Sequence, residues 1–234
     1  MNASDCPSSE TPTETRRAAW FVAICCAVYF TSYITRKGYD ASILAICEET
    51  GLARSAAGFA STAAVVLYGS GQFVTGYLAD RFDARKIILA ALLLTATCNA
   101  AMPFIAGCVP AMVAFWAVNG FAQAMFWPPL VKIVAANLQQ SAYRGAVFLI
   151  SVSCNIASFA VYLLVSGCIR ISGWRLSFVV STFVALAMAA LWGATARRLA
   201  PHSGIRLMAL KSSTEPKKSS WNPGDGEIGV YECV

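Results

Sequence analysis

Long runs without a single charged residue dominate this sequence. Uncharged stretches of 18, 25, 45, 25 and 21 residues separate Arg17 from Arg36, Arg54 from Asp80, Lys86 from Lys132, Arg144 from Arg170, and Arg175 from Arg197. A helix needs about 20 apolar residues to cross the hydrocarbon core of a bilayer. Only 13% of the 234 residues are charged, about half the share found in soluble domains. This composition excludes an ordinary soluble enzyme and predicts a protein that crosses a membrane several times.

The 45-residue stretch is too long for one helix, and a turn at Gly107-Cys108-Val109-Pro110 divides it near its middle. Six transmembrane helices are therefore expected, at residues 18–39, 55–79, 86–106, 111–138, 144–169 and 174–196. The predicted fold is an all-α membrane protein with a six-helix domain at 18–198. A leader at 1–17 and a tail at 199–234 are too polar to bury a core and are expected to be disordered. Pro128-Pro129 is expected to kink the fourth helix.

Lys and Arg are distributed unequally between the two sides that this arrangement defines. Twelve of them fall on the side of the N-terminus and three on the other side. Cytoplasmic loops of membrane proteins carry the excess of Lys and Arg. Both termini are therefore expected in the cytoplasm, with the chain in the plasma membrane, that is, the inner membrane of a bacterium.

Residues that hold metals or perform catalysis are scarce. The nine cysteines include no C-x-x-C pair, and the single histidine, His202, falls in the polar tail. A zinc or iron–sulfur site lacks its usual ligand spacing. We expect no catalytic residue, no metal, no cofactor and no nucleic-acid partner, so the chain is not expected to be an enzyme.

One expected span carries two basic residues near its end. Tyr29, Tyr33 and Arg36 share one helix face, and Lys37 follows directly. A guanidinium at membrane depth is costly and marks a functional site when it faces a cavity. Arg presents a planar fork to phosphate oxygens, and Tyr hydroxyls can donate further hydrogen bonds. The alternative is that Arg36 and Lys37 extend to the headgroups at the end of the helix.

The loop after the second expected span is rich in charge. It contains Gly76, Asp80, Arg81 and Arg85. The spacing of these residues resembles the G-x-x-x-D-R-x-x-x-R/K signature of the major facilitator superfamily. The resemblance implies a conformational latch between the two halves of a transporter. Asp83 stands where most members have glycine, and a solvated cytoplasmic turn is the simpler interpretation of such a loop.

Further motifs resemble the organophosphate:phosphate antiporters of that superfamily. The pattern Tyr-x-x-x-Tyr-x-x-Arg-Lys recurs at residues 29–37, Tyr-Gly-x-x-Lys recurs at 68–72 with Gln72 in place of the lysine, and Trp-Pro-Pro recurs at 127–129. The resemblance implies a substrate site formed by Tyr29, Tyr33, Arg36, Lys37, Tyr68, Gln72, Trp127, Lys132 and Asn155. Lys132 has an alternative role as a residue that reaches the cytoplasmic surface.

The resemblance covers residues 16 to about 198, which is one six-span half of a twelve-span facilitator built from three-plus-three inverted repeats. It implies transport of glycerol-3-phosphate or a sugar phosphate in exchange for inorganic phosphate, by a truncated or half-size facilitator. A membrane sensor of sugar phosphate with the same fold and an inactive fragment are the alternatives. The expected partners are the phosphorylated substrate, inorganic phosphate, the lipid bilayer, and a second half-transporter or a second copy.

Overall fold

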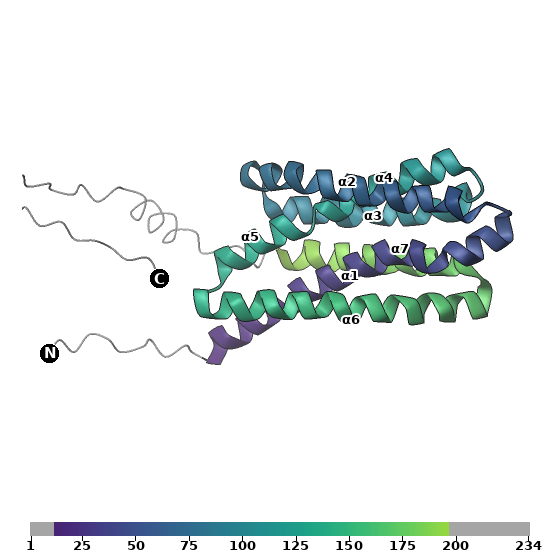
Figure 1. The fold of residues 1–234 in the computed structure, drawn as a ribbon. Helices are drawn as coiled ribbons and strands as arrows, with labels where there is room; N and C mark the ends of the chain where they lie inside the picture. Colours follow the sequence, from purple (N-terminus) through teal and green to yellow (C-terminus); the bar gives the residue numbers. More distant parts are fainter. Residues whose placement is uncertain (1–11, 197–234) are drawn as a thin grey trace, which may run out of the picture. The chain divides into compact units, whose positions relative to one another are not determined.

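The chain folds into seven helices within the residues that the structure, a computed structural model, describes, which are 12–196. They are α1 (Pro12–Thr50), α2 (Arg54–Arg81), α3 (Ala84–Ile105), α4 (Val109–Ala124), α5 (Trp127–Asn137), α6 (Gln140–Ser172) and α7 (Trp174–Ala196) (Figure 1). The predicted all-α fold is confirmed. The expected tail and residues 1–11 of the expected leader lie outside the described residues.

Helices α4 and α5 together make the fourth span, which is interrupted at Met125 and Phe126. Pro128 and Pro129 are the second and third residues of α5, within the first turn, where a missing backbone N–H does the least harm. Within a continuous helix, the N–H of residue 128 would bond to the carbonyl of Ala124. The Thr75 hydroxyl of α2 lies 3.0 Å from that carbonyl oxygen instead. The predicted kink is therefore a break, and its carbonyl is satisfied from a neighbouring helix.

Five spans are long and apolar enough to cross a membrane, with α4 and α5 counted as one. Helix α2 is the span that does not reach this level of hydropathy among the described helices. It has 28 residues, but many of them are Ala, Ser, Gly and Thr. Its small residues allow close packing instead: a Cβ added to Gly120 of α4 would lie 2.1 Å from the Ala64 carbonyl oxygen of α2. Helices in membranes use small residues in this way.

Helix α1 is longer than the predicted 18–39. It begins at Pro12, inside the expected leader, and continues to Thr50. The sequence prediction ended the span at residue 39, just after Arg36 and Lys37, because charged residues usually mark a membrane surface. The chain after Asp40 is apolar again, and Ile46 and Cys47 are buried against the neighbouring helices. The charged residues therefore lie along the helix rather than at its end.

The packing of the helices follows the predicted inverted repeat. Helix α2 packs chiefly on α4, α1 on α6, and α3 on α7. In the repeat, α1, α2 and α3 of the first three spans correspond to α4–α5, α6 and α7 of the last three. The α2–α4 pair therefore corresponds to the α6–α1 pair, and the α3–α7 pair corresponds to itself. Because each repeat has three spans, the second repeat crosses the membrane in the opposite direction to the first. In Figure 1, α2, α3 and α4 form one group and α1, α6 and α7 form the other.

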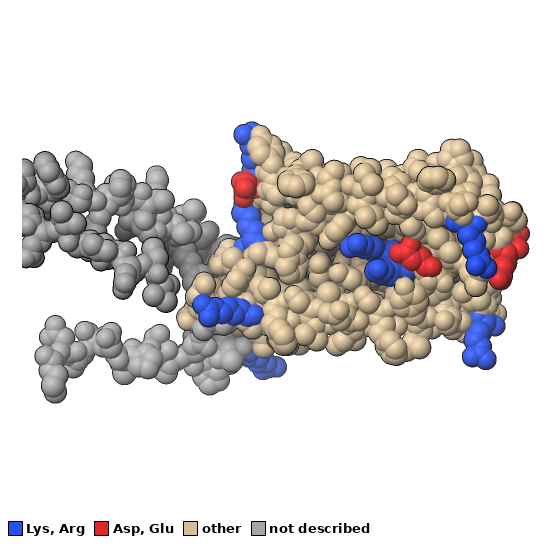
Figure 2. Space-filling model, in the orientation of Figure 1, with Lys and Arg blue, Asp and Glu red and all other residues tan. Residues whose placement is uncertain are grey.

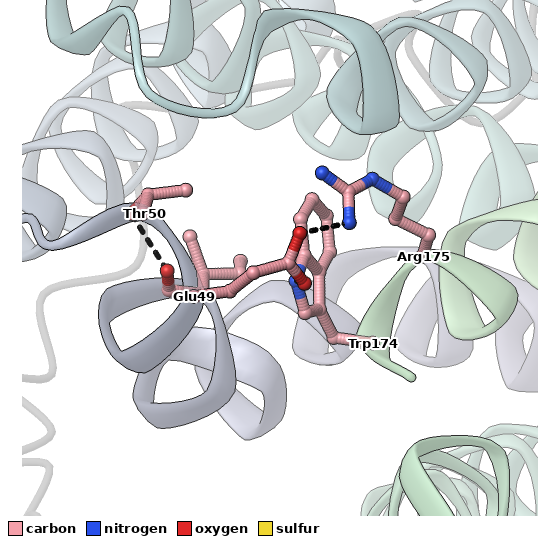
Figure 3. Close-up of polar contacts among 5 residues, drawn as sticks. Glu49, Thr50, Trp174 and Arg175 are labelled. Carbon is pink, nitrogen blue, oxygen red and sulfur yellow. Dashed lines mark hydrogen bonds and ion pairs between the residues drawn. The ribbon is translucent and has the colours of Figure 1, made fainter. Parts of the chain in front are cut away.

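A hydrogen-bonded contact joins the end of α1 to the start of α7 (Figure 3). The Glu49 carboxylate accepts a hydrogen bond from the Trp174 indole N–H at 2.7 Å and a second from Arg175. The Arg175 guanidinium lies 4.6 Å from the centre of the Trp174 ring. Gly173, with a φ of 87°, is the single residue between α6 and α7, and a side chain there would be strained.

Candidate functional site

A layer of polar side chains crosses the helix bundle between two apolar clusters. One cluster contains Ile88, Phe126 and Trp192, and the other contains Tyr39 and Met102. The polar layer comes from α1, α3 and α4 and consists of Thr35, Thr95, Asn99, Asn119 and Gln123, all of them buried. Buried polar groups are costly unless they are hydrogen-bonded, so this layer must be held together by its own contacts.

The hydrogen bonds of the layer converge on Thr35 of α1. The Gln123 amide N–H groups lie 3.1 Å from the Thr35 hydroxyl and 3.0 Å from the Thr95 hydroxyl. Thr95 donates to the Asn119 side-chain oxygen at 2.5 Å. The Asn99 amide donates to the Thr35 carbonyl oxygen at 3.2 Å. The layer thereby fixes α1 against α3 and α4 directly before Arg36.

A cleft opens beside this layer, between α1, α2 and α4. Its lining residues are Arg36, Lys37, Asp40, Ser61, Ala64, Val65, Tyr68, Trp116, Asn119, Gly120 and Gln123. Figure 2 shows basic and acidic side chains gathered in the middle of this face, separated by uncharged surface from the charged side chains at the two ends. The cleft combines three charged side chains with the amides of the polar layer, and this combination suits a small polar or ionic ligand.

Arg36 lies against two tyrosines. Its guanidinium carbon is 4.1 Å from the ring centre of Tyr68 in α2 and 5.9 Å from that of Tyr33, one turn earlier in α1. Cation–π contacts of this kind hold a guanidinium in place without using its N–H donors. The helix continues from Arg36 to Thr50, about 20 Å further. This placement favours a cleft residue over one that extends to the headgroups at the helix end.

Three of the aromatic residues selected from the sequence form a row beside Arg36. The Tyr29 ring centre lies 5.4 Å from that of Tyr33 and 5.1 Å from that of Trp127. Trp127 opens α5, so the break in the fourth span places its indole against α1. The row joins Arg36 to the apolar cluster on one side of the polar layer.

The remaining substrate-site candidates lie elsewhere. Gln72 is partly buried and is not among the residues that line the cleft. Asn155 is exposed, and its amide donates to the Ser151 carbonyl oxygen of its own helix at 2.9 Å. Lys132 donates to the Ala79 carbonyl oxygen and lies 3.4 Å from an Asp80 carboxylate oxygen. The structure therefore brings Lys132 to the end of α2 and not to Arg36.

The residues proposed from the sequence as a latch lie around the turn from α2 to α3. Asp80 faces Lys132, and the Arg81 guanidinium lies 4.5 Å from the Tyr77 ring centre. Arg85 accepts a hydrogen bond at its carbonyl oxygen from the Trp192 indole at 3.0 Å, and a Cβ added to Gly76 would meet no atom within 4 Å.

Asp83 stands in this turn where the signature has glycine. Its side chain accepts a hydrogen bond from the Arg85 backbone N–H at 3.0 Å, and its φ is −64°. It is the N-cap of α3, a position that aspartate favours. The turn therefore accommodates aspartate without strain.

Sequence reasoning did not select Thr35, Thr95, Asn99 and Asn119 of the polar layer, or Asp40 and Ser61 of the cleft. A signal for the layer was present, because Asn99, Asn119 and Gln123 are carboxamides within the longest uncharged stretch. Asp40 was not selected because the predicted first span ended at residue 39, just before it. Within residues 12–196, no three His, Cys, Asp or Glu side chains lie close enough together to hold a metal ion.

Comparison with known proteins gives consistent matches. Residues 25–222 match the Major Facilitator Superfamily. A probable hexose phosphate transport protein of Chlamydia muridarum is 25% identical over 173 residues, which are 72% of this chain and 38% of that protein. A glycerol-3-phosphate transporter of Bacillus subtilis is 30% identical over 110 residues, which are 46% of this chain and 24% of that protein.

The membrane sensor protein UhpC of Salmonella typhimurium is 27% identical over 158 residues, which are 68% of this chain and 36% of that protein. Among solved structures, the transporter PepTSo superposes with a TM-score of 0.64 at 15% identity, over 88% of this chain and 44% of that one. The chain thus spans less than half the length of the proteins that it matches.

Proposed function

The chain belongs to the Major Facilitator Superfamily, and we propose that it carries organophosphates, glycerol-3-phosphate or a sugar phosphate, across a membrane in exchange for inorganic phosphate. Members of this superfamily are multi-pass membrane proteins, and the apolar helices agree with that placement. The three relatives named above are similar to this chain over 38%, 36% and 24% of their own length. Substrate, exchange and direction are therefore proposals for the protein as a whole.

The observation that carries this proposal is the placement of Arg36. No Asp or Glu of the described residues lies within 4 Å of its guanidinium. A positive charge in the middle of a membrane protein is costly without an opposite charge. A phosphate group supplies that charge and matches the planar fork of Arg in two parallel hydrogen bonds. Arg36 is therefore the proposed phosphate anchor, with Lys37, Tyr33 and Tyr68 beside it.

The other sequence candidates keep a role only as proposals. Tyr29 and Trp127 support the aromatic row, and Gln72 and Asn155 face the cleft only if the helices move relative to each other. Lys132 is assigned to the latch, with Gly76, Asp80, Arg81 and Arg85, because of its contact with Asp80.

Alternating access requires a second six-span half. We propose that another part of the same protein, or a second copy, closes the cleft opposite Arg36. The proposed orientation, from the balance of Lys and Arg, has both termini in the cytoplasm and the chain in the inner membrane of a bacterium. The proposed domain lies at 18–198, with the leader at 1–17 and the tail at 199–234. We propose no catalytic step.

A sensor is the second candidate, and the similarity to UhpC favours it. A sensor needs the ligand site and a signal to a partner, but it needs no exchange. Both candidates predict saturable binding of a phosphate ester that depends on Arg36.

Uptake of radiolabelled glycerol-3-phosphate and glucose 6-phosphate separates the two candidates. Membrane vesicles from cells that make the protein are loaded with inorganic phosphate, and vesicles with the Arg36→Ala variant are the control. A transporter accumulates label only when phosphate is inside, whereas a sensor binds label without accumulation. If the wild-type protein neither binds nor accumulates either ester, the proposed function is wrong.

A further inference from the structure

Asp40 introduces a negative charge into a cleft that the proposed function treats as an anion site. It lies in α1 one turn beyond Arg36 and lines the cleft together with Arg36 and Lys37. A phosphate group alone would be repelled by this carboxylate. A simple phosphate site therefore does not account for the presence of Asp40.

The opposite charges of the cleft do not neutralise each other. Within residues 12–196, the ion pairs closer than 4 Å are Lys132–Asp80 and Arg175–Glu49. Arg36, Lys37 and Asp40 belong to neither pair, although residues four apart on a helix are close enough to pair. Some feature of the neighbouring helices must keep them apart.

Helix α2 holds the two charges away from each other. The Ser61 hydroxyl donates to an Asp40 carboxylate oxygen at 2.5 Å, and the Tyr68 ring holds the Arg36 guanidinium at 4.1 Å. Ser61 and Tyr68 are seven residues apart, about 10 Å along α2, whereas Arg36 and Asp40 are about 6 Å apart along α1. The two helices run in opposite directions, so Ser61 draws Asp40 and Tyr68 draws Arg36 toward opposite ends of the cleft.

From this geometry we propose that the cleft accepts a zwitterionic organophosphate, with its phosphate at Arg36 and a protonated amine at Asp40. The inference rests on the proposed function, because it takes Arg36 as the phosphate anchor. Because Arg36 and Asp40 do not pair within 4 Å and are held by Tyr68 and Ser61 at different levels of α2, the proposed ligand carries its amine and its phosphate on separate parts of one molecule, as in the phosphate of an amino sugar. A charged hydrogen bond at each end would neutralise both side chains, of which Arg36 is partly buried and Asp40 is exposed in the cleft.

A matched pair of ligands tests this proposal. Glucosamine 6-phosphate and glucose 6-phosphate differ in one group on the ring, an amine or a hydroxyl. Each displaces radiolabelled inorganic phosphate from membranes that hold the full-length protein. A charged hydrogen bond to the amine predicts that the wild-type protein binds the amino ester about tenfold or more tightly.

The Asp40→Asn variant should bring the two affinities to within about twofold of each other. Asparagine retains an oxygen that can accept from Ser61, so the variant should fold. Glu48→Gln removes an exposed carboxylate from the same helix outside the cleft and should leave the preference unchanged.

Several outcomes overturn the proposal. Equal affinities in the wild-type protein, or a preference that persists in Asp40→Asn, would show that Asp40 does not bind the amine. A gain in affinity for both esters alike in Asp40→Asn would show that the carboxylate only repels phosphate. These results leave the proposed function standing if phosphate binding still depends on Arg36. If no phosphate ester and no inorganic phosphate binds, both the proposal on Asp40 and the proposed function are wrong.

Discussion

Charged residues in the middle of the helix bundle and at its two ends are held in opposite ways. At the ends, Asp80 pairs with Lys132 and Glu49 pairs with Arg175, and all four side chains are close to half exposed or more. In the middle, Arg36 and Asp40 lie in one cleft without pairing. Figure 2 shows both groups, because charged side chains gather at the two ends and again at the centre.

The difference indicates what each set of charges is for. An exposed ion pair contributes little to stability, since water solvates its members with or without the partner. Arg36 and Asp40 in the cleft have no ion-pair partner within 4 Å, although Asp40 is exposed and Arg36 is partly buried. Our proposal is that a ligand neutralises the central charges, so replacing them should affect binding far more than stability. The end pairs should show small effects on both.

The largest expected effect follows from removing the central guanidinium. Arg36→Ala should weaken binding of inorganic phosphate about 100-fold or more, because two charge-assisted hydrogen bonds are lost. Equilibrium binding to membranes measures this effect. Arg36→Lys keeps the charge but loses the fork and should fall between Ala and wild type. Arg170→Ala, at the exposed end of α6, is the matched control. A similar loss in that control would show that binding responds to total charge and not to the cleft.

The next effect concerns the polar layer that fixes α1 beside the cleft. Thr95→Val keeps the shape of the side chain but removes the donor to Asn119 and the acceptor for Gln123. Unpaired buried polar groups cost about 1–3 kcal/mol, so thermal unfolding in detergent should occur at a lower temperature, and phosphate binding should weaken. Thr97→Val on the same helix is the control, since Thr97 is exposed and bonds only within its helix. Equal shifts for the two variants would contradict a structural role for the layer.

A smaller effect is expected at the turn between α2 and α3. Asp80→Asn removes the ion pair with Lys132, which is worth about 1 kcal/mol or less on an exposed surface. Phosphate binding should stay within about twofold of wild type, while exchange in vesicles slows if Asp80 acts as a latch. Loss of binding in this variant would place Asp80 in the ligand site and remove the contrast between centre and ends.

The smallest effect is expected at the opposite end of the molecule. Glu49→Gln removes the charge that Arg175 contacts but leaves an oxygen for the Trp174 indole. Phosphate affinity and the temperature of unfolding should be close to those of the wild-type protein. A change in affinity as large as that of Arg36→Ala would show that the ends are coupled to the cleft.

Much of the fold could be predicted from the sequence because uncharged length is a strong signal. The number and approximate positions of the spans follow from it, although α2 falls below the hydropathy of the other spans. The inverted repeat was expected from the family resemblance, and the interruption of the fourth span from Pro128 and Pro129. The error at α1 comes from the same use of uncharged length. A charge usually marks a membrane surface, but Arg36 and Asp40 lie within the helix because α2 supplies Tyr68 and Ser61 as partners. Such partners depend on helix packing, which no local pattern specifies.

The residues of the candidate site also divide into those that the sequence could predict and those that it could not. Tyr33, Arg36 and Tyr68 share neighbouring faces, so the structure brings them together. Lys132 was grouped with them because of the family resemblance, but the structure places it beside Asp80 at the end of α2. Asn119 and Gln123 gain their significance only from the opposing Thr35 and Thr95, which are distant in sequence.

The central claim is that the middle of the bundle is a water-accessible ligand site that closes around a phosphate ester. Ser61→Cys places a thiol in the cleft beside Asp40, in a background where the native cysteines are serine. Its reaction with a charged thiol reagent in membranes, with and without glycerol-3-phosphate, tests the claim most directly. The account predicts rapid reaction that the ester slows at least about fivefold, with no such protection when Arg36 is also replaced by Ala. A thiol that does not react, or one that reacts at the same rate with and without ester, would contradict it.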